Sequence, residues 1–340
     1  MIIDYAEPGM ILGQDITDQY GKLLLEKGMA LTESYIKRLR NLGIDKISVS
    51  DHEATLLKQQ QAISTELRTE LTLCFQSFSS LQTSFLANDA LTNLYLEQVE
   101  RIICTIVHQA SEQMTDIMNT QVWQPNENDI VHAINVCLLS IITGLQLNLP
   151  KSVLYDLALG ALLHDIGKFT LPCINGTLFD STKLHTLYGR NLLLKSKLSP
   201  TIAQIVAEHH ETLNGTGLPL GLTSNKIHHL SKIVALANFF DRKMTTTVID
   251  NAPQEEVFEY MLANADTLFD SSILEAFTSA IPLYPVGCMV LLNTNRTAYV
   301  MKNHLNNSLR PIVKMNTSNG QITTNLLDEP TLDIIKIIEY

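Results

Sequence analysis

The spacing of apolar residues predicts a largely helical chain with short strands near both ends. Between residues 125 and 275, apolar positions recur three and four apart, which is the period of a helix that buries one face. Residues 52–120 show the same spacing and contain no Gly or Pro. After residue 282 the apolar runs shorten and alternate with turn sequences such as Ser318-Asn319-Gly320. The predicted fold class is mainly α, a helical bundle flanked by a small α+β module and a small β-rich module.

These changes of pattern divide the chain into four predicted segments. The outer two are the small modules, and the inner two are a long-helix linker or bundle extension and the bundle itself. The predicted boundaries are 1–51, 52–124, 125–280 and 281–340. In the C-terminal module, strands are expected at 289–292, 297–301, 311–315 and 335–338.

The N-terminal module is predicted to contain a β-hairpin, a helix and a strand. Short apolar runs at 10–12 and 22–25 flank a turn sequence at 18–21, which is typical of a hairpin. A helix is expected from about 31 to 39, followed by a closing strand at 44–49.

Caps and helix breakers locate the longer helices. Within 52–124, one amphipathic helix is expected around 67–78 and another from about Asp89, a plausible N-cap. Ser199 followed by Pro200 is a strong helix start. In the bundle, helices are expected at about 129–147, 150–165, 181–194, 199–210 and 229–244.

Charge and cysteine content narrow the possible partners. The chain of 340 residues has 24 Lys and Arg against 35 Asp and Glu, and its formal net charge of −11 argues against a nucleic-acid polymer as partner.

Its five cysteines form no CxxC pair, which is typical of reduced cytosolic thiols. The N-terminus has acidic residues where a signal peptide is basic, and the longest apolar stretch, 136–149, contains polar residues. We expect a cytoplasmic protein without membrane insertion.

Histidines in the bundle carry the candidate chemistry. Five of the ten histidines lie at helix positions or helix ends in this region, and His164 is followed by Asp165 at the end of a very apolar helix. A lone histidine is more often a packed residue than a ligand. Two adjacent buried polar groups are costly to desolvate, however, and a metal ion removes that cost. Imidazole and carboxylate together suit Fe, Mn, Zn or Ni.

The order of these residues resembles the HD-GYP family, a branch of the HD phosphohydrolases. The modules on both sides of the bundle also look like those that often flank this domain. Five strings carry the resemblance of the bundle: HAINV at 132–136, ALLHDIGK at 161–168, LHTLYG at 184–189, EHHETLNGTGLPLGL at 208–222 and IVALANFFD at 233–241.

This resemblance implies a metal-dependent phosphodiesterase that hydrolyses cyclic di-GMP, a small-molecule substrate, in bacterial second-messenger signalling. It implies two divalent metal ions, iron or manganese, and catalytic roles for Asp165 and Lys168. The implied metal ligands are His132, His164, Asp165, His185, His209 and His210, with Asn238 as a doubtful seventh. The implied substrate-binding residues are Lys168, Gly215, Gly217 and Pro219.

Departures from the family pattern leave alternatives open. Asn238 stands where the family has a ligating Asp, Leu218 replaces the Tyr of GYP, and no basic stretch is recognisable after Asp241. Asn128 stands where trinuclear members carry an acidic ligand, which favours two metal ions. The alternatives are a catalytically weakened adaptor protein and a phosphohydrolase for another nucleotide. The helices at 53–118 could support a homodimer, or could pack on the bundle.

Overall fold

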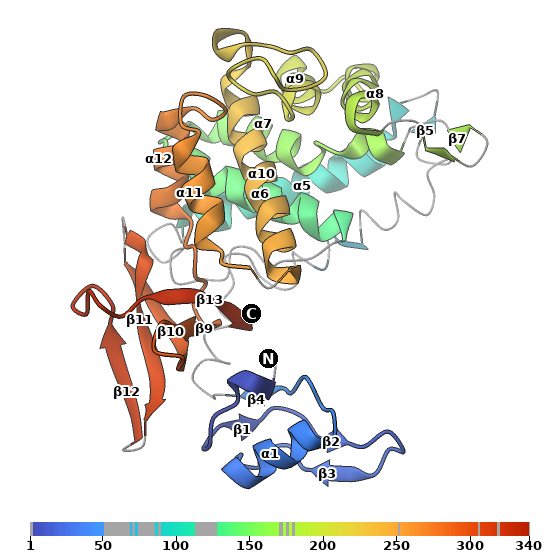
Figure 1. The fold of residues 1–340 in the computed structure, drawn as a ribbon. Helices are drawn as coiled ribbons and strands as arrows, with labels where there is room; N and C mark the ends of the chain where they lie inside the picture. Colours follow the sequence, from blue (N-terminus) through green and yellow to red (C-terminus); the bar gives the residue numbers. More distant parts are fainter. Residues whose placement is uncertain are drawn as a thin grey trace.

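The computed structural model describes residues 3–50, 69, 72–73, 86–87, 90–112, 128–169, 173–174, 177–178, 181–250, 252–304, 307–317 and 320–339. Figure 1 shows a helical bundle, a C-terminal sheet beside it, and the N-terminal module on the far side of the sheet. This architecture confirms the predicted fold class, which is mainly α with a small module at each end. The boundaries between the segments stay predictions.

The bundle contains the five helices expected from the sequence and two more. The two additional helices are α11 and α12, and the Gln254 side chain before α11 caps no backbone N–H. The helices are α6 (Asp129–Gln146), α7 (Lys151–Leu162), α8 (Ser181–Lys195), α9 (Pro200–Glu208), α10 (His229–Ile249), α11 (Glu255–Ala263) and α12 (Ser271–Ala280).

Local capping explains where two of these helices begin. The Asn128 side chain accepts hydrogen bonds from the backbone N–H groups of Ile130 and Val131, so this residue starts α6. The Ser199 hydroxyl accepts from Thr201 N–H, and Pro200 occupies the first turn of α9. Between α7 and α8 lie the 3-10 turn η3 (Ile166–Phe169) and the short hairpin β7 (Cys173–Ile174) and β8 (Thr177–Leu178).

Helix α6 is the central helix of the bundle. By length and composition it could cross a membrane, with a mean hydropathy of 1.5, but 72% of it is buried inside the protein. It packs against α7, α10 and α12, so its apolar residues form the core of the bundle. A buried core helix passes the same composition test as a membrane span.

Part of segment 52–124 belongs to this core. Helix α5 (Asn93–Glu112) packs on α6 and α7 and buries Val99, Ile102 and Ile106. It begins at Asn93 and not near Asp89, because Thr92 accepts the first hydrogen bonds of the helix. The strands β5 (Leu86–Ala87) and β6 (Ala90–Leu91) precede it. The helix predicted around 67–78 lies almost entirely outside the described residues.

The C-terminal module is an antiparallel sheet with strand order β12-β11-β10-β9-β13. Its strands are β9 (Met289–Leu292), β10 (Thr297–His304), β11 (Asn307–Thr317), β12 (Gly320–Asn325) and β13 (Ile334–Glu339). The four predicted strands are confirmed, and β12 was not predicted because its sequence, GQITTN, is mostly polar.

The N-terminal module pairs its strands differently from the sequence prediction. The predicted pairing of residues 10–12 with 22–25 is wrong: β2 (Ile16–Thr17) pairs with β3 (Leu23–Leu25), and β1 (Ile11–Leu12) pairs with β4 (Val49–Ser50). The predicted turn closes the β2–β3 hairpin, because the Asp18 side chain accepts from Tyr20 N–H and Lys22 N–H. The 3-10 turn η1 (Ile3–Tyr5) and helix α1 (Glu33–Asn41) complete the module.

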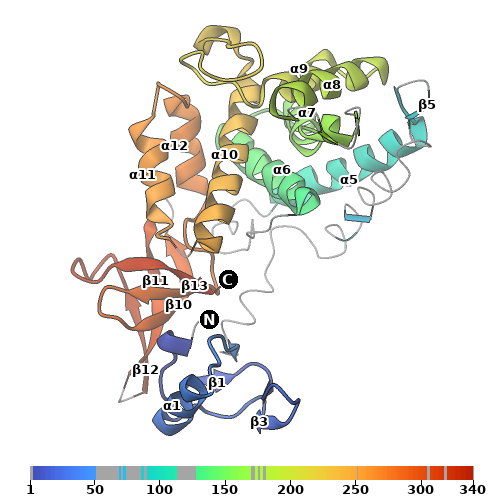
Figure 2. The same ribbon diagram turned by 45° about the vertical axis from the view of Figure 1, so that its right-hand side comes forward.

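Both faces of the sheet are covered. Val290 and Leu292 of β9 belong to the core of the bundle, whereas Met289 belongs to the core of the N-terminal module. Successive side chains of a strand point to opposite faces, so the sheet lies between the two. Figure 2 shows this arrangement from a second direction. The C-terminal sheet therefore shares one continuous core with the helices that carry the site.

Candidate metal centre

Six of the predicted ligands come together inside the bundle. His132 lies in the first turn of α6, and His164 and Asp165 lie between α7 and η3. His185 lies on α8, and His209 and His210 directly follow α9. They form two groups that share Asp165, and within each group the ligand atoms lie within 4.8 Å of one another. The groups are His132, His164 and Asp165, and Asp165, His185, His209 and His210.

A close backbone contact at Gly167 places His185 beside Asp165. A Cβ atom on Gly167 would lie 1.8 Å from the His185 carbonyl oxygen and 2.7 Å from the Gly189 nitrogen. Only glycine allows η3 to approach α8 this closely. The close approach of η3 to α8 therefore explains why the HDIGK string needs glycine at position 167.

Hydrogen bonds orient three of the imidazole rings. The Nδ1 atoms of His132, His164 and His209 lie 2.6, 2.7 and 2.9 Å from Asp241 Oδ2, Ala161 O and Val206 O. Carbonyl and carboxylate oxygens only accept, so each Nδ1 carries the proton and donates. With Nδ1 donating, each ring directs Nε2 toward the site, which is the arrangement of a metal-binding histidine.

Two of these Nε2 atoms face each other. His132 Nε2 lies 3.2 Å from His164 Nε2, and a cation between or beside them relieves their repulsion. Asp165 Oδ1 is buried and accepts no hydrogen bond of normal geometry from the described residues. It lies 3.2 Å from His185 Nε2 and 3.7 Å from His209 Nε2. An orphaned carboxylate oxygen among imidazole nitrogens fits a transition metal ion.

Burial keeps these ligands in their metal-binding protonation states. It lowers the pKa of His209 to about 3 and that of His210 to about 2, and it lowers the pKa of His132 as well. Burial by itself would raise the pKa of Asp165, but the imidazoles of His164, His185 and His209 hold it well below its ordinary value. At neutral pH His132, His209 and His210 are therefore neutral, and Asp165 is charged.

Two cationic side chains contact the other oxygen of Asp165. Lys168 Nζ donates to Asp165 Oδ2 and lies 3.5 Å from Asp129 Oδ1. Arg242 Nη2 donates to the same Asp165 oxygen at 2.9 Å, and Arg242 Nε donates to Asn238 Oδ1 at 3.3 Å. Lys168 therefore lies at the site, and its catalytic role stays a prediction. Asn238 lies next to the site, with its amide oxygen bonded to Arg242.

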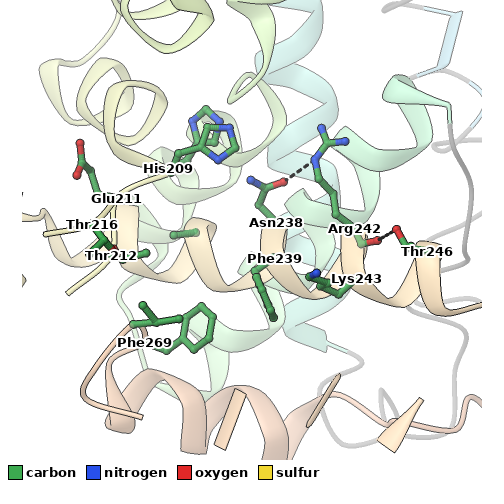
Figure 3. Close-up of a pocket in the computed structure, with 13 residues that line it drawn as sticks. His209, Glu211, Thr212, Thr216, Asn238, Phe239, Arg242, Lys243, Thr246 and Phe269 are labelled. Carbon is green, nitrogen blue, oxygen red and sulfur yellow. Dashed lines mark hydrogen bonds between the residues drawn. The ribbon is translucent and has the colours of Figure 1, made fainter. Parts of the chain in front are cut away.

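A cavity of about 510 Å³ opens beside the histidines. Its walls include the basic residues Arg242 and Lys243 and two aromatic rings, Phe239 and Phe269, whose centroids are 5.0 Å apart. Figure 3 shows Asn238 and Arg242 on the side of α10 near His209, and Phe239 on the opposite side toward Phe269. The cavity thus combines positive charge, aromatic surface and the candidate metal ligands.

The glycine-rich loop, residues 211–222, packs against the histidine pair His209 and His210. Leu218 N–H donates to the His210 carbonyl at 3.0 Å, and the buried Glu211 carboxylate accepts from Leu220 N–H and Leu222 N–H. A Cβ atom on Gly217 would lie 2.4 Å from Glu211 Cα, and Gly215 has a φ of +79°. Pro219 follows a cis peptide bond. From this loop, Thr212 and Thr216 line the cavity, and the substrate-binding roles of Gly215, Gly217 and Pro219 stay predictions.

Three functional residues were missed from the sequence. Asp241 orients His132 and also accepts from Asn135 Nδ2 at 2.7 Å, Glu211 holds the loop, and Arg242 contacts Asp165. No basic stretch is recognisable after Asp241, so the sequence did not point to Arg242 and Lys243. Both residues line the cavity from α10. Their signal was the helical spacing: Arg242 follows Asn238 by one turn.

Part of this chain is similar to known proteins. A family model described as HD domain matches residues 135–273. A cyclic di-GMP phosphodiesterase of Pseudomonas aeruginosa is 30% identical over 199 residues, which cover 56% of this chain and 48% of the relative. The cyclic di-GMP phosphodiesterase PdeB of Borreliella burgdorferi is 26% identical over 207 residues, covering 57% and 53%.

A third relative, the 3'3'-cGAMP-specific phosphodiesterase 3 of Vibrio cholerae, is 29% identical over 165 residues, covering 45% of this chain and 35% of that protein. The solved structure of an HDG"Y"P protein from Bdellovibrio bacteriovorus covers 82% of this chain and 97% of that one, with 19% identity and a TM-score of 0.45. The chain spans about half the length of the first two curated relatives. The match to the HD domain model covers residues 135–273, and the motif strings of the chain resemble those of the HD-GYP type.

Proposed function

We propose that this protein is a metal-dependent phosphodiesterase that hydrolyses cyclic di-GMP to the linear dinucleotide or to GMP in bacterial signalling. The observation that carries the proposal is the convergence of buried imidazole nitrogens on Asp165, beside a cavity with cationic and aromatic walls. The names of the relatives from P. aeruginosa and B. burgdorferi support the choice of substrate.

The two ligand groups offer two candidate metal positions that share Asp165, and iron or manganese is the proposed metal. When bound, the metal would supply Lewis acidity toward the phosphate and a nucleophile from water near neutral pH. Asp165 and the histidines would hold the metal, and Asp241, Ala161 and Val206 fix the ring orientations.

Other residues of the chain bind the substrate in this proposal. Lys168, which is 28% exposed, stabilises the negative charge that develops on the phosphate. Arg242 and Lys243 attract the phosphates from the cavity wall, and Phe239 and Phe269 offer aromatic faces for the bases. Lys168, Arg242 and Lys243 place positive charge at the site, although the chain as a whole is acidic.

The test is turnover by the protein loaded with Mn²⁺ or Fe²⁺ under reducing conditions. Cyclic di-GMP is expected to yield linear dinucleotide or GMP, measured by chromatography. Asp165→Asn should remove bound metal and turnover together, whereas Asp250→Asn, at an exposed position after α10, is the matched control. Absence of turnover with either metal bound would overturn the proposal.

Asn238 favours a second candidate function. An amide at this position is neutral and a weaker ligand than a carboxylate, so the protein could bind a metal ion and nucleotide as an adaptor without rapid hydrolysis. Binding of cyclic di-GMP without turnover would support this function. The relatives named for 3'3'-cGAMP justify including that nucleotide in the same panel, and exclusive action on it would identify a different substrate.

Location and assembly remain part of the proposal. The unpatterned cysteines favour a cytoplasmic protein, and the acidic charge argues against a nucleic-acid polymer as partner. A homodimer through 53–118 stays a prediction, since most of that segment lies outside the described residues. Helix α5, the described part, buries its apolar face within the bundle.

A further inference from the structure

Asn238 and Arg242 form a linked pair on α10. They lie four residues apart, so their side chains share one face of the helix, as Figure 3 shows. Asn238 is 4% exposed, and its Oδ1 accepts from Arg242 Nε at 3.3 Å. Arg242, with a side chain that is 46% exposed, continues to Asp165 Oδ2 at 2.9 Å. The Arg242 guanidinium therefore links Asn238 to Asp165, the carboxylate that both ligand groups share.

The two oxygens of Asp165 have different surroundings. Oδ1 lies near His185 Nε2 and His209 Nε2, and no Lys or Arg among the described residues pairs with it. Oδ2 lies 3.3 Å from His164 Nε2 and 3.9 Å from His132 Nε2. It also receives both Lys168 and Arg242. Among the described residues, no Lys or Arg side chain pairs with the Oδ1 position. The Oδ2 position already has two cations, Lys168 and Arg242.

The ligand charges reinforce this difference. At the Oδ2 position the protein ligands are neutral imidazoles and one carboxylate oxygen that is already paired with two cations. An aspartate at 238 would add a negative charge there, but the amide of Asn238 adds none. A divalent ion entering this position would be repelled by the guanidinium at close range. At the Oδ1 position, three histidines and an orphaned oxygen meet no such repulsion.

We propose that Arg242 takes the place of the second metal ion. The protein binds one divalent ion tightly, at Asp165 Oδ1 with His185, His209 and His210. Arg242, held by Asn238, supplies the second positive charge next to Asp165. This inference rests on the proposed metal-dependent function, and it concerns the number of ions and not the substrate.

The test is the stoichiometry of Mn²⁺ binding to the full chain, by calorimetry and elemental analysis, with electron paramagnetic resonance as an independent readout. The expected result is one tight Mn²⁺ per chain with the spectrum of an isolated ion, and a second ion at least ten-fold weaker. The double variant Asn238→Asp, Arg242→Gln should bind two ions tightly and give an exchange-coupled spectrum. Arg242→Gln alone should strengthen the second ion, since it removes the competing charge.

Lys243→Gln is the matched control, because it removes one positive charge from the same helix and cavity wall. It should leave the stoichiometry at one. Two ions of similar affinity in the unmodified protein, or an unchanged stoichiometry in the double variant with native circular dichroism, would overturn the inference. Turnover is measured separately: one tight ion without turnover contradicts only the proposed function, and two equal ions with turnover contradict only the inference.

Discussion

His132 Nδ1 lies 2.6 Å from Asp241 Oδ2, although the two residues are 109 positions apart and both are buried. The carboxylate accepts the Nδ1 proton, so it sets the ring orientation and the tautomer of His132. Asp241 is the last residue of the IVALANFFD string, and it acts on the site through His132.

Replacing this carboxylate should weaken metal binding without removing a ligand. We expect Asp241→Asn to lower the affinity for the second, weaker Mn²⁺ ion by about 10–100-fold, because the His132 ring loses the acceptor that holds its lone pair toward that position. Calorimetry measures the change, with the exposed Asp250→Asn as control. Unchanged affinity would show that His132 takes no part in metal binding.

Gly167→Ala should disrupt the contact between η3 and α8. The new Cβ would meet the His185 backbone carbonyl, which cannot move without shifting α8. We expect a loss of about 3 kcal/mol or more in the free energy of unfolding, together with loss of bound metal. Gly144→Ala is the control: its Cβ meets only leucine side chains, and alanine favours a helix, so its effect on urea unfolding should be smaller.

The metal-free protein should lose stability as the pH falls below about 6.5. The folded protein holds the pKa of His209 at about 3, below its ordinary value of 6.5. Between pH 3 and pH 6.5 the unfolded chain therefore binds a proton that the folded chain excludes. Each such histidine lowers the free energy of unfolding by about 1.4 kcal/mol for each pH unit of acidification. The stabilising contribution is fully present above pH 6.5 and is lost progressively toward pH 3.

Urea unfolding in the presence of a chelator measures this slope. His209→Asn should reduce the slope of the unfolding free energy against pH by the value for one proton, about 1.4 kcal/mol per pH unit. His108→Asn, at a side chain that is 62% exposed, should leave it unchanged. An equal slope in the His209 variant and the unmodified protein would contradict the expected origin of the pH dependence.

Glu211→Gln should loosen the glycine-rich loop. The buried carboxylate accepts from Leu220 N–H at 2.7 Å and from Leu222 N–H at 2.8 Å, and an amide offers only one oxygen. We expect a loss of about 1.5–3 kcal/mol in local stability, seen as faster hydrogen exchange at residues 215–222. Exchange in α6 should stay the same, and equal loosening of α6 would indicate global unfolding instead.

Local signals explain which parts of the fold were predictable. The bundle helices follow from apolar periodicity and from caps such as Asn128 and Ser199. Helix α11 was missed because no side chain caps its first turn. The pairing of β1 with β4 was mispredicted because a two-residue strand has too few side chains to specify its partner, and the intervening helix α1 brings β4 back to β1.

The sequence by itself determined the helical class of this protein and the identity of its candidate ligands. Histidines at helix ends and the HDIGK string are local features, and they keep their meaning without coordinates. The tertiary structure decided which atoms face one another. It brought Asp241 to His132, Arg242 to Asp165 and Gly167 to His185 across long stretches of chain. These contacts depend on helix packing angles and side-chain directions, which no local pattern contains.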